Sequence, residues 1–214
     1  RKIKRELQSR DGFVIVTLGW ICITLLSSLP YYFSFTHLSF TNSFFESMSG
    51  LTTTGATILG HPSTFQIEDL SKGLLFWRSF TQFIGGMGII VFSIAILPML
   101  GMGGVQLFRA EVAGPVAEKI TPRVKQTAKL LWGIYVGLVL LETLILKIEG
   151  MSWFDSLCHS FTTIATAGFS TKNGSIGAFN SSIIEYTIII FMIIAATNFS
   201  LHYLFLARKK FDYF

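Results

Sequence analysis

The chain has 214 residues, of which 51% are hydrophobic and 14% are charged. A soluble domain carries about a quarter charged residues, so this composition argues against an ordinary soluble domain and indicates an integral membrane protein. The net charge of +5 does not point to nucleic acid, because most Lys and Arg residues lie at 1–10, 101–130 and 208–210, between or beside apolar stretches. Basic residues in such gaps are typical of the cytoplasmic face of a membrane protein, and no nucleic-acid partner is expected.

Four apolar stretches reach the roughly 20 residues needed to cross about 30 Å of hydrocarbon. They cover residues 12–33, 73–100, 127–148 and 183–207. The first predicts a membrane helix and not a signal peptide, because its apolar run is too long and lacks a small-residue cleavage site. Four crossings place both termini on one side, which the basic residues mark as cytoplasmic. We therefore expect a multi-pass protein in contact with membrane lipid.

The two outer connections share a short helix followed by small residues. Residues 41–50 and 154–163 have apolar positions at helical spacing but are too short to span, so each predicts a helix that enters the membrane and stops. "TTTGAT" and "ATAGFS" follow these helices. Glycine permits unusual backbone conformations, and irregular backbone at membrane depth must be buried in protein or line water.

A shift of 113 residues aligns residues 39–57 with residues 152–170 without a gap. The identical pairs are Ser39 with Ser152, Ser43 with Ser156, Ser47 with Ser160, Thr53 with Thr166, and Gly55 with Gly168. Such an internal repeat decides the architecture. The sequence predicts an all-α integral membrane fold of two tandem helix–pore loop–helix repeats, with four membrane-spanning helices plus two short re-entrant pore helices. The repeats would occupy 1–108 and 127–214, joined by a cytoplasmic connection at 109–126.

Backbone carbonyls in such a loop can replace the hydration shell of a cation, as in a selectivity filter. The short helix would add the negative end of its dipole. An ordinary surface turn would explain one such loop, but it does not explain two loops at equivalent positions. We therefore interpret both loops as pore-lining segments.

Arg78 lies within an apolar stretch, where a charge is costly and is usually paired or functional. We favour a structural role, in which Arg78 either extends to the membrane interface or pairs with an acid such as Glu46 and supports the pore helix, over a role in setting the external potential. Gly85, Gly86 and Gly88 suggest close helix packing more than a hinge. The two cysteines, Cys22 and Cys158, are interpreted as small buried hydrophobic residues.

A membrane-embedded enzyme is not favoured, because the apolar stretches contain no paired acids, no His–Glu constellation and no Ser–His–Asp set. The four histidines share no metal-ligand spacing. We expect no enzyme activity, no cofactor and no transition-metal site.

"SGLTTTGAT", "WRSFTQFIGGMGIIVFSIAILPMLGMGGVQLFRAEVAGP" and "TIATAGFST" resemble the potassium-translocating subunit of the Trk/Ktr cation-uptake superfamily, nearest its bacterial Trk-type members. In that family one chain carries four helix–pore loop–helix units around a central pore, with one filter glycine in each unit. The resemblance extends over nearly the whole chain but matches only the first two units. It therefore implies the N-terminal half of such a pore, as a fragment, a truncation or a natural half.

The resemblance implies that potassium is the transported ion and that the filter segments bind it. These segments are Thr52, Thr53, Thr54 and Gly55 in the first repeat, and Ala165, Thr166, Ala167 and Gly168 in the second. In the family, glycine at the filter position accompanies potassium preference, and serine in the first unit accompanies sodium transport. Gly55 and Gly168 therefore imply a potassium-selective filter, with K⁺ as the only metal ion.

The resemblance also implies partners and a location. The missing pore half would come from the same full-length chain, a second copy or another chain, and the full-length family forms homodimers. A cytosolic nucleotide-binding regulatory subunit would bind the cytoplasmic side, with Arg109, Glu111, Arg123 and Lys125 as candidate contacts, although positive-inside anchoring explains most of them equally well. The location would be the bacterial inner (plasma) membrane. Channel-like flux and coupling to H⁺ or Na⁺ both stay open, and the alternative function is a non-conducting regulatory or assembly subunit.

Overall fold

The computed structural model describes residues 9–34, 38–60, 65–96, 124–197, 199 and 201–202. Secondary structure in these residues is helical throughout, with no strand among them. The helices are α1 (Ser9–Tyr32), α2 (Phe40–Leu51), η1 (Ile67–Asp69), α3 (Lys72–Ile96), α5 (Val124–Ile148), α6 (Trp153–Ile164), η3 (Ser175–Phe179) and α7 (Ser182–Ala196). The predicted all-helical class is confirmed.

The helices coincide with the predicted elements. The long helices α1, α3, α5 and α7 occupy the four apolar stretches, and α2 and α6 each extend one residue beyond the predicted short helices at both ends. Residues 97–100 and 203–207 of the predicted stretches lie outside the described residues, as does most of the connection 109–126. Because α5 begins at Val124, the last residues of that predicted connection are helical.

The fourth predicted stretch is not one continuous helix. α7 ends at Ala196, where Thr197 adopts an extended backbone with φ −77° and ψ 150°. The Thr197 hydroxyl donates to the carbonyl of Ile194 at 2.7 Å and lies 2.6 Å from His202 Nε2. The helix thus ends without a proline or glycine at Thr197, with these side-chain bonds at the break.

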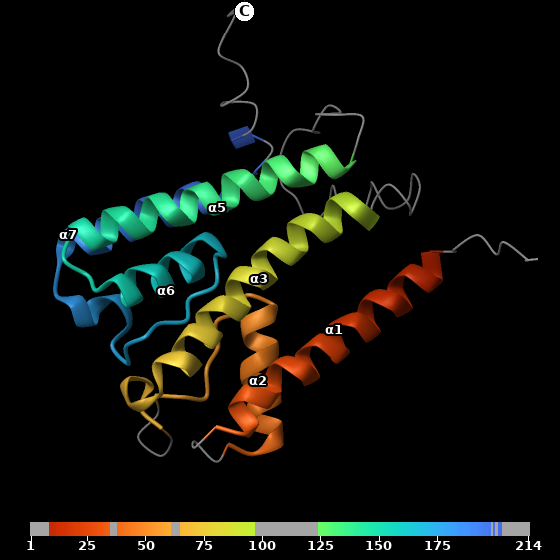
Figure 1. Ribbon diagram of the computed structural model, residues 1–214, viewed down its shortest axis with the longest axis horizontal. Helices are drawn as coiled ribbons and strands as arrows, with labels where there is room; N and C mark the ends of the chain where they lie inside the picture. The colour runs from red at the N-terminus through yellow and green to blue at the C-terminus, as the bar shows by residue number, and fades with distance from the viewer. Residues whose placement is uncertain are drawn as a thin grey trace, which may run out of the picture.

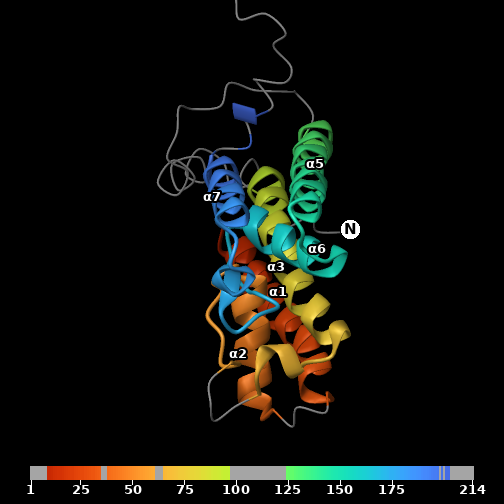
Figure 2. The same ribbon diagram turned by 90° about the vertical axis from the view of Figure 1, so that its left-hand side faces the viewer.

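α3 is the central helix, since it contacts α1, α2, α5 and α6. Figure 1 shows α3 between α1 on one side and α5 with α6 on the other. In the view turned by 90°, α7 lies next to α6 (Figure 2). The two short helices therefore pack against the same long helix.

Two adjacent glycines allow α3 to approach both short helices. A Cβ atom on Gly85 would overlap the backbone carbonyl of Leu51, the last residue of α2. A Cβ on Gly86 would lie 2.8 Å from the Tyr135 hydroxyl and 3.1 Å from Cα of Ala165, which caps α6. The predicted close packing is confirmed at these two positions, whereas Gly88 has open space beside it.

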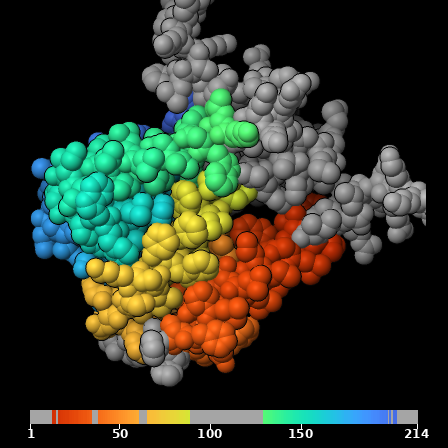
Figure 3. All heavy atoms as spheres, viewed as in Figure 1, coloured from red at the N-terminus to blue at the C-terminus, as the bar shows by residue number. Residues whose placement is uncertain are grey.

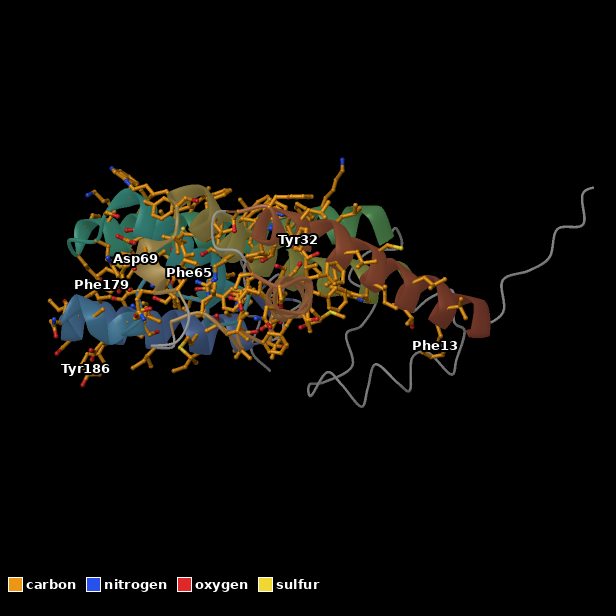
Figure 4. The ribbon with its side chains drawn as sticks, turned by 90° about the horizontal axis from the view of Figure 1, so that it is seen from below. Phe13, Tyr32, Phe65, Asp69, Phe179 and Tyr186 are labelled. Atoms are coloured by element: carbon orange, nitrogen blue, oxygen red, sulfur yellow. The ribbon has the colours of Figure 1, made fainter. Side chains whose placement is uncertain are left out.

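Many large apolar side chains lie on the outside of the described helices, while polar ones lie between helices. Exposed residues include Phe13, Leu26, Leu140, Ile183 and Tyr186, and Figure 4 shows Phe13 and Tyr186 projecting away from the ribbon. Buried polar residues include Thr24, Ser28, Ser47, Gln82 and Glu142. Polar side chains that face the bundle interior are the pattern expected in a membrane.

Within the described residues, one stretch, Lys129–Ile148, is both long and apolar enough to cross a membrane, and Val16–Tyr32 and Ser182–Ala196 are shorter apolar helices. The space-filling view shows α1, α3, α5 and α6 in close contact over one face (Figure 3).

Cys158 is buried as predicted, but the prediction for Cys22 was wrong, because its side chain lies on the exposed surface of α1.

Candidate functional site

The two short helices begin in the same way. The hydroxyl of Ser39 accepts a hydrogen bond from the backbone N–H of Asn42 at 3.2 Å. The hydroxyl of Ser152 accepts one from the N–H of Asp155 at 3.0 Å. Serine satisfies an amide that would otherwise have no partner at a helix N-terminus. The equivalent serines of the 113-residue shift therefore fix equivalent helix starts.

The segments that follow the short helices share a backbone conformation. φ is positive at Thr53 (54°) and Gly55 (75°) in the first segment, and at Thr166 (53°) and Gly168 (119°) in the second. Positive φ is uncommon for threonine and costs backbone strain. Because the unusual angles recur at aligned positions, the sequence alignment is also an alignment of backbone geometry.

Backbone hydrogen bonds fold both segments back onto their helices. The N–H of Thr54 donates to the carbonyl of Ser49 at 3.0 Å, and the N–H of Ala167 donates to the carbonyl of Thr162 at 3.0 Å. These acceptors are themselves related by the 113-residue shift. The segments are therefore hydrogen-bonded turns with left-handed residues.

The two segments meet at Gly55 and Ala167. A Cβ on Gly55 would overlap the carbonyl oxygen of Ala167 and would lie 3.5 Å from Cα of Gly168. The neighbouring segment thus leaves no room for a side chain at position 55. The positive φ would also strain the backbone of any residue other than glycine there. Gly168 has open space around its Cα, so its requirement for glycine comes from φ alone.

Of the eight predicted filter residues, the structure brings Gly55 of the first segment against Ala167 and Gly168 of the second. Thr52, Thr54, Thr166 and Gly168 are exposed, and Thr53, Gly55 and Ala167 are half-buried. Ala165 is buried at the C-cap of α6. A cavity of ≈ 350 Å³ borders the second segment at Thr166, Ala167 and Gly168, and its lining includes Ile188 and Met192 of α7.

Arg78 and Glu46 form the predicted ion pair. Nη2 of Arg78 lies 3.0 Å from Oε1 of Glu46, and the two side chains are 1% and 0% exposed. The Thr57 hydroxyl accepts from Arg78 Nη2 at 3.1 Å and donates to Glu46 Oε1 at 2.7 Å. The N–H of Ile58 donates to Oε2 at 3.2 Å. Arg78 does not extend toward solvent, and Glu46 holds the end of the first segment.

Arg78 also reaches the second segment. Its Nη1 donates to the backbone carbonyl of Ser170 at 3.1 Å, and its guanidinium lies 4.4 Å from the centroid of the Phe169 ring. Thr57 and Ser170 are related by the shift of 113 residues. A single arginine thus contacts the same position in both segments. The N–H of Phe169 donates to Gln82 Oε1 at 3.2 Å, which ties this segment to α3 as well.

His159 is a site residue that the search for metal-ligand spacings missed. It is 2% exposed, and its Nε2 lies 3.0 Å from the hydroxyl of Ser170. The 113-residue shift aligns Glu46 with His159 and Thr57 with Ser170. This alignment was the signal that could have identified His159.

Polar contacts join the segment that precedes α3 to the segment between α6 and α7. The N–H of Ile67 donates to Asn173 Oδ1 at 2.8 Å, and the N–H of Asn173 donates to Glu68 Oε1 at 2.9 Å.

Asp155 accepts from the hydroxyls of Ser152 and Thr171, both at 2.6 Å. Although partial burial raises the pKa of Asp155, these hydrogen bonds and the nearby His159 and Lys172 together outweigh it and lower the pKa below its ordinary value.

The described residues contain no group of three or more His, Cys, Asp or Glu side chains placed to hold a metal ion. The oxygen atoms at the two segments belong to backbone carbonyls and threonine hydroxyls. Uncharged oxygens of this kind suit a weakly held monovalent cation better than a divalent ion, which generally takes carboxylate ligands.

Comparison with known proteins identifies the family. The model of the TrkH family, described as "Cation transport protein", matches residues 1–213. The chain is 48% identical over 205 residues to the Trk system potassium uptake protein TrkH of Vibrio parahaemolyticus, covering 95% of this chain and 41% of that protein. It is 48% identical over 212 residues to the protein of the same name from Escherichia coli K12, covering 98% and 43%.

The structure is similar to the crystal structure of the potassium transporter TrkH from Vibrio parahaemolyticus. The TM-score is 0.78 at 43% sequence identity, covering 98% of this chain and 41% of that one. The chain therefore spans about two-fifths of the length of these relatives. Because the family model matches nearly every residue, the chain belongs to the TrkH family of cation transport proteins.

Proposed function

We propose that the chain forms the first two of four pore-loop units in a potassium-transporting membrane subunit. Residues Thr52–Gly55 and Ala165–Gly168 would be its share of the selectivity filter. One observation carries the proposal: two segments 113 residues apart have the same caps and left-handed residues, and they meet at Gly55 and Ala167.

The preference for potassium follows from the chemistry of these segments. Their backbone carbonyls would replace the hydration shell of the ion. α2 and α6 end immediately before the segments, so the negative ends of both helix dipoles would stabilise a cation there. The related proteins named above are potassium uptake and potassium transporter proteins, which supports K⁺ as the ion.

We propose a supporting role for Arg78 and Glu46. The buried guanidinium is paired with Glu46, so its charge would be directed at the protein and not at the ion path. Its bonds to Thr57 and Ser170 would hold both segments at the same depth. Arg78 would therefore stabilise the filter without repelling the transported cation.

We further propose that the chain is a multi-pass protein of the bacterial inner membrane with cytoplasmic termini. Exposed aromatic residues near the start of α6 and α7 include Trp153 and Tyr186. Such residues are enriched at membrane interfaces, and the Lys147 ammonium lies 5.8 Å from the Trp153 ring. These features suit the outer interface, whereas the basic segments 1–10, 101–130 and 208–210 suit the cytoplasmic one.

The proposed partners follow from the length of the chain relative to its family. Two further units would complete the pore, supplied by the rest of a full-length chain, a second copy or another chain. A homodimer of the complete protein and a cytosolic nucleotide-binding subunit on the basic face remain part of the proposal. Lys125 lies at the start of α5, and the other candidate contacts lie outside the described residues.

A complementation experiment tests the function. The chain would replace the matching segment of the Escherichia coli relative, and the chimera would be expressed in a strain that lacks potassium uptake. We expect growth at low external potassium, comparable to that given by the intact relative. A chimera that inserts at the same level but gives no growth, like an empty vector, would contradict the proposal and favour a non-conducting subunit.

A further inference from the structure

We infer that His159 positions the second filter segment, as the neutral counterpart of Glu46 in the first. This inference rests on the proposed function of the two segments. It assigns to His159 an indirect role, in which the imidazole holds the backbone next to the filter residues and does not bind the ion. The argument starts from the matching contacts in the two repeats.

In the first repeat, a side chain of the short helix holds the hydroxyl that follows the filter segment. Glu46 lies on α2, and its Oε1 accepts from the Thr57 hydroxyl at 2.7 Å. Thr57 comes two residues after Gly55. The contact spans the whole segment, so it fixes the end of the segment relative to its own helix.

In the second repeat, His159 makes the corresponding contact. His159 lies on α6, and its Nε2 is 3.0 Å from the hydroxyl of Ser170, two residues after Gly168. Its Nδ1 is 2.8 Å from the carbonyl of Asp155. A carbonyl can only accept, so Nδ1 carries a proton. Because His159 is 2% exposed and burial disfavours the charged imidazolium, we assign the neutral ring, in which Nε2 accepts from Ser170.

The Ser170 hydroxyl also makes a hydrogen bond with a group other than His159. It accepts from the backbone N–H of Lys172 at 3.0 Å and donates to His159. The Ser170 carbonyl accepts from Arg78. The neutral imidazole therefore completes a set of hydrogen bonds that fixes both the side chain and the backbone of Ser170.

Glu46 is a carboxylate and His159 is neutral, and this difference agrees with the presence or absence of a nearby buried cation. Arg78 of α3 neutralises Glu46, whereas α7, the long helix that follows the second segment, contains no Lys or Arg. A second buried carboxylate at position 159 would lack its own cation, and an uncompensated buried charge is strongly destabilising. A neutral histidine makes the same contact with serine without that cost.

The test measures ion selectivity in the complete transporter. His159→Phe removes both ring hydrogen bonds, whereas His159→Gln keeps an acceptor near the position of Nε2. Each variant would be placed in the chimera with the Escherichia coli relative, and the ratio of potassium to sodium uptake would be measured. Because a buried hydrogen bond is lost, we expect His159→Phe to lower this ratio about tenfold, and His159→Gln to restore most of it.

Ser170→Ala supplies an independent check. Because it breaks the same contact, its effect should not add to that of His159→Phe. Ser160→Ala is the matched control, since Ser160 is buried in the same helix and its hydroxyl bonds within that helix, to the carbonyl of Ser156. Ser160→Ala should leave the ratio unchanged.

Backbone hydrogen exchange gives a second measurement that does not depend on transport. In the purified protein, His159→Phe should accelerate exchange of the amides in residues 166–172, and Ser160→Ala should not. An unchanged ratio together with unchanged exchange in His159→Phe would overturn the inference. Faster exchange in a chimera that never selects potassium would instead count against the proposed function and leave the positioning role supported.

Discussion

Arg78 of α3 and Glu46 of α2 form a buried ion pair, with Nη2 and Oε1 3.0 Å apart. The same guanidinium donates to Thr57 and to the carbonyl of Ser170, so it joins the residues that follow the two proposed filter segments. A buried pair of this kind adds little net stability compared with apolar residues, but removal of one partner is costly. This asymmetry gives the first prediction.

Neutralising Glu46 should destabilise the protein more than removing both charges. Glu46→Gln leaves Arg78 buried without a counter-ion, and we expect a loss of about 3 kcal/mol or more in the free energy of unfolding. Combining it with Arg78→Met should recover part of that loss. Unfolding in mixed detergent micelles measures both values.

Glu185→Gln is the control for this comparison, because Glu185 is exposed near the start of α7. A surface change of this kind should alter stability by at most about 0.5 kcal/mol. If Glu46→Gln were equally mild, the ion pair would not support the segments.

Substitution by alanine should lower the free energy of unfolding at Gly85 and raise it at Gly88. Gly85→Ala places a methyl group in the carbonyl of Leu51, and overpacking of this kind costs about 1–3 kcal/mol. Gly88→Ala has open space and should stabilise α3 by up to about 1 kcal/mol through helix propensity. The two unfolding free energies are measured in parallel, and equal effects would rule out a contact specific to Gly85.

Asn173 should hold the segment before α3 against the segment between α6 and α7. Asn173→Ala removes the acceptor for the N–H of Ile67, so exchange of that amide with solvent should become about tenfold faster once its hydrogen bond is lost. Lys172→Ala, at the neighbouring position, leaves this acceptor in place and should have no such effect. Slow exchange at Ile67 in Asn173→Ala would show that another group protects the amide.

The sequence predicted the elements whose pattern is local. α2 and α6 were recognisable because helical spacing and a glycine-containing run occur twice at the same separation. Close packing at Gly85 and Gly86 followed from the general use of small residues in membrane helices, but their contact with the ends of the short helices did not. The pairing of Arg78 with Glu46 followed from the cost of an isolated charge.

Other features depended on contacts that a local pattern does not reveal. His159 carried no signal as a metal ligand, and its partner Ser170 is identified only when the two repeats are superposed. The end of α7 at Thr197 carries no proline or glycine that would mark it in the sequence. The exposed position of Cys22 depends on which face of α1 contacts α2 and α3.

The most direct test of the central claim is the potassium-to-sodium flux ratio in liposomes that contain the complete chimeric transporter, with Gly55 or with Gly55→Ser. A side chain at position 55 would meet the carbonyl of Ala167, so it would alter both segments at once. We predict potassium-selective flux with Gly55 and a clear fall in the ratio with Gly55→Ser, while Gly73→Ser, at an open position of α3, leaves it unchanged. Equal selectivity with Gly55 and with Gly55→Ser would contradict the assignment of these segments to the filter.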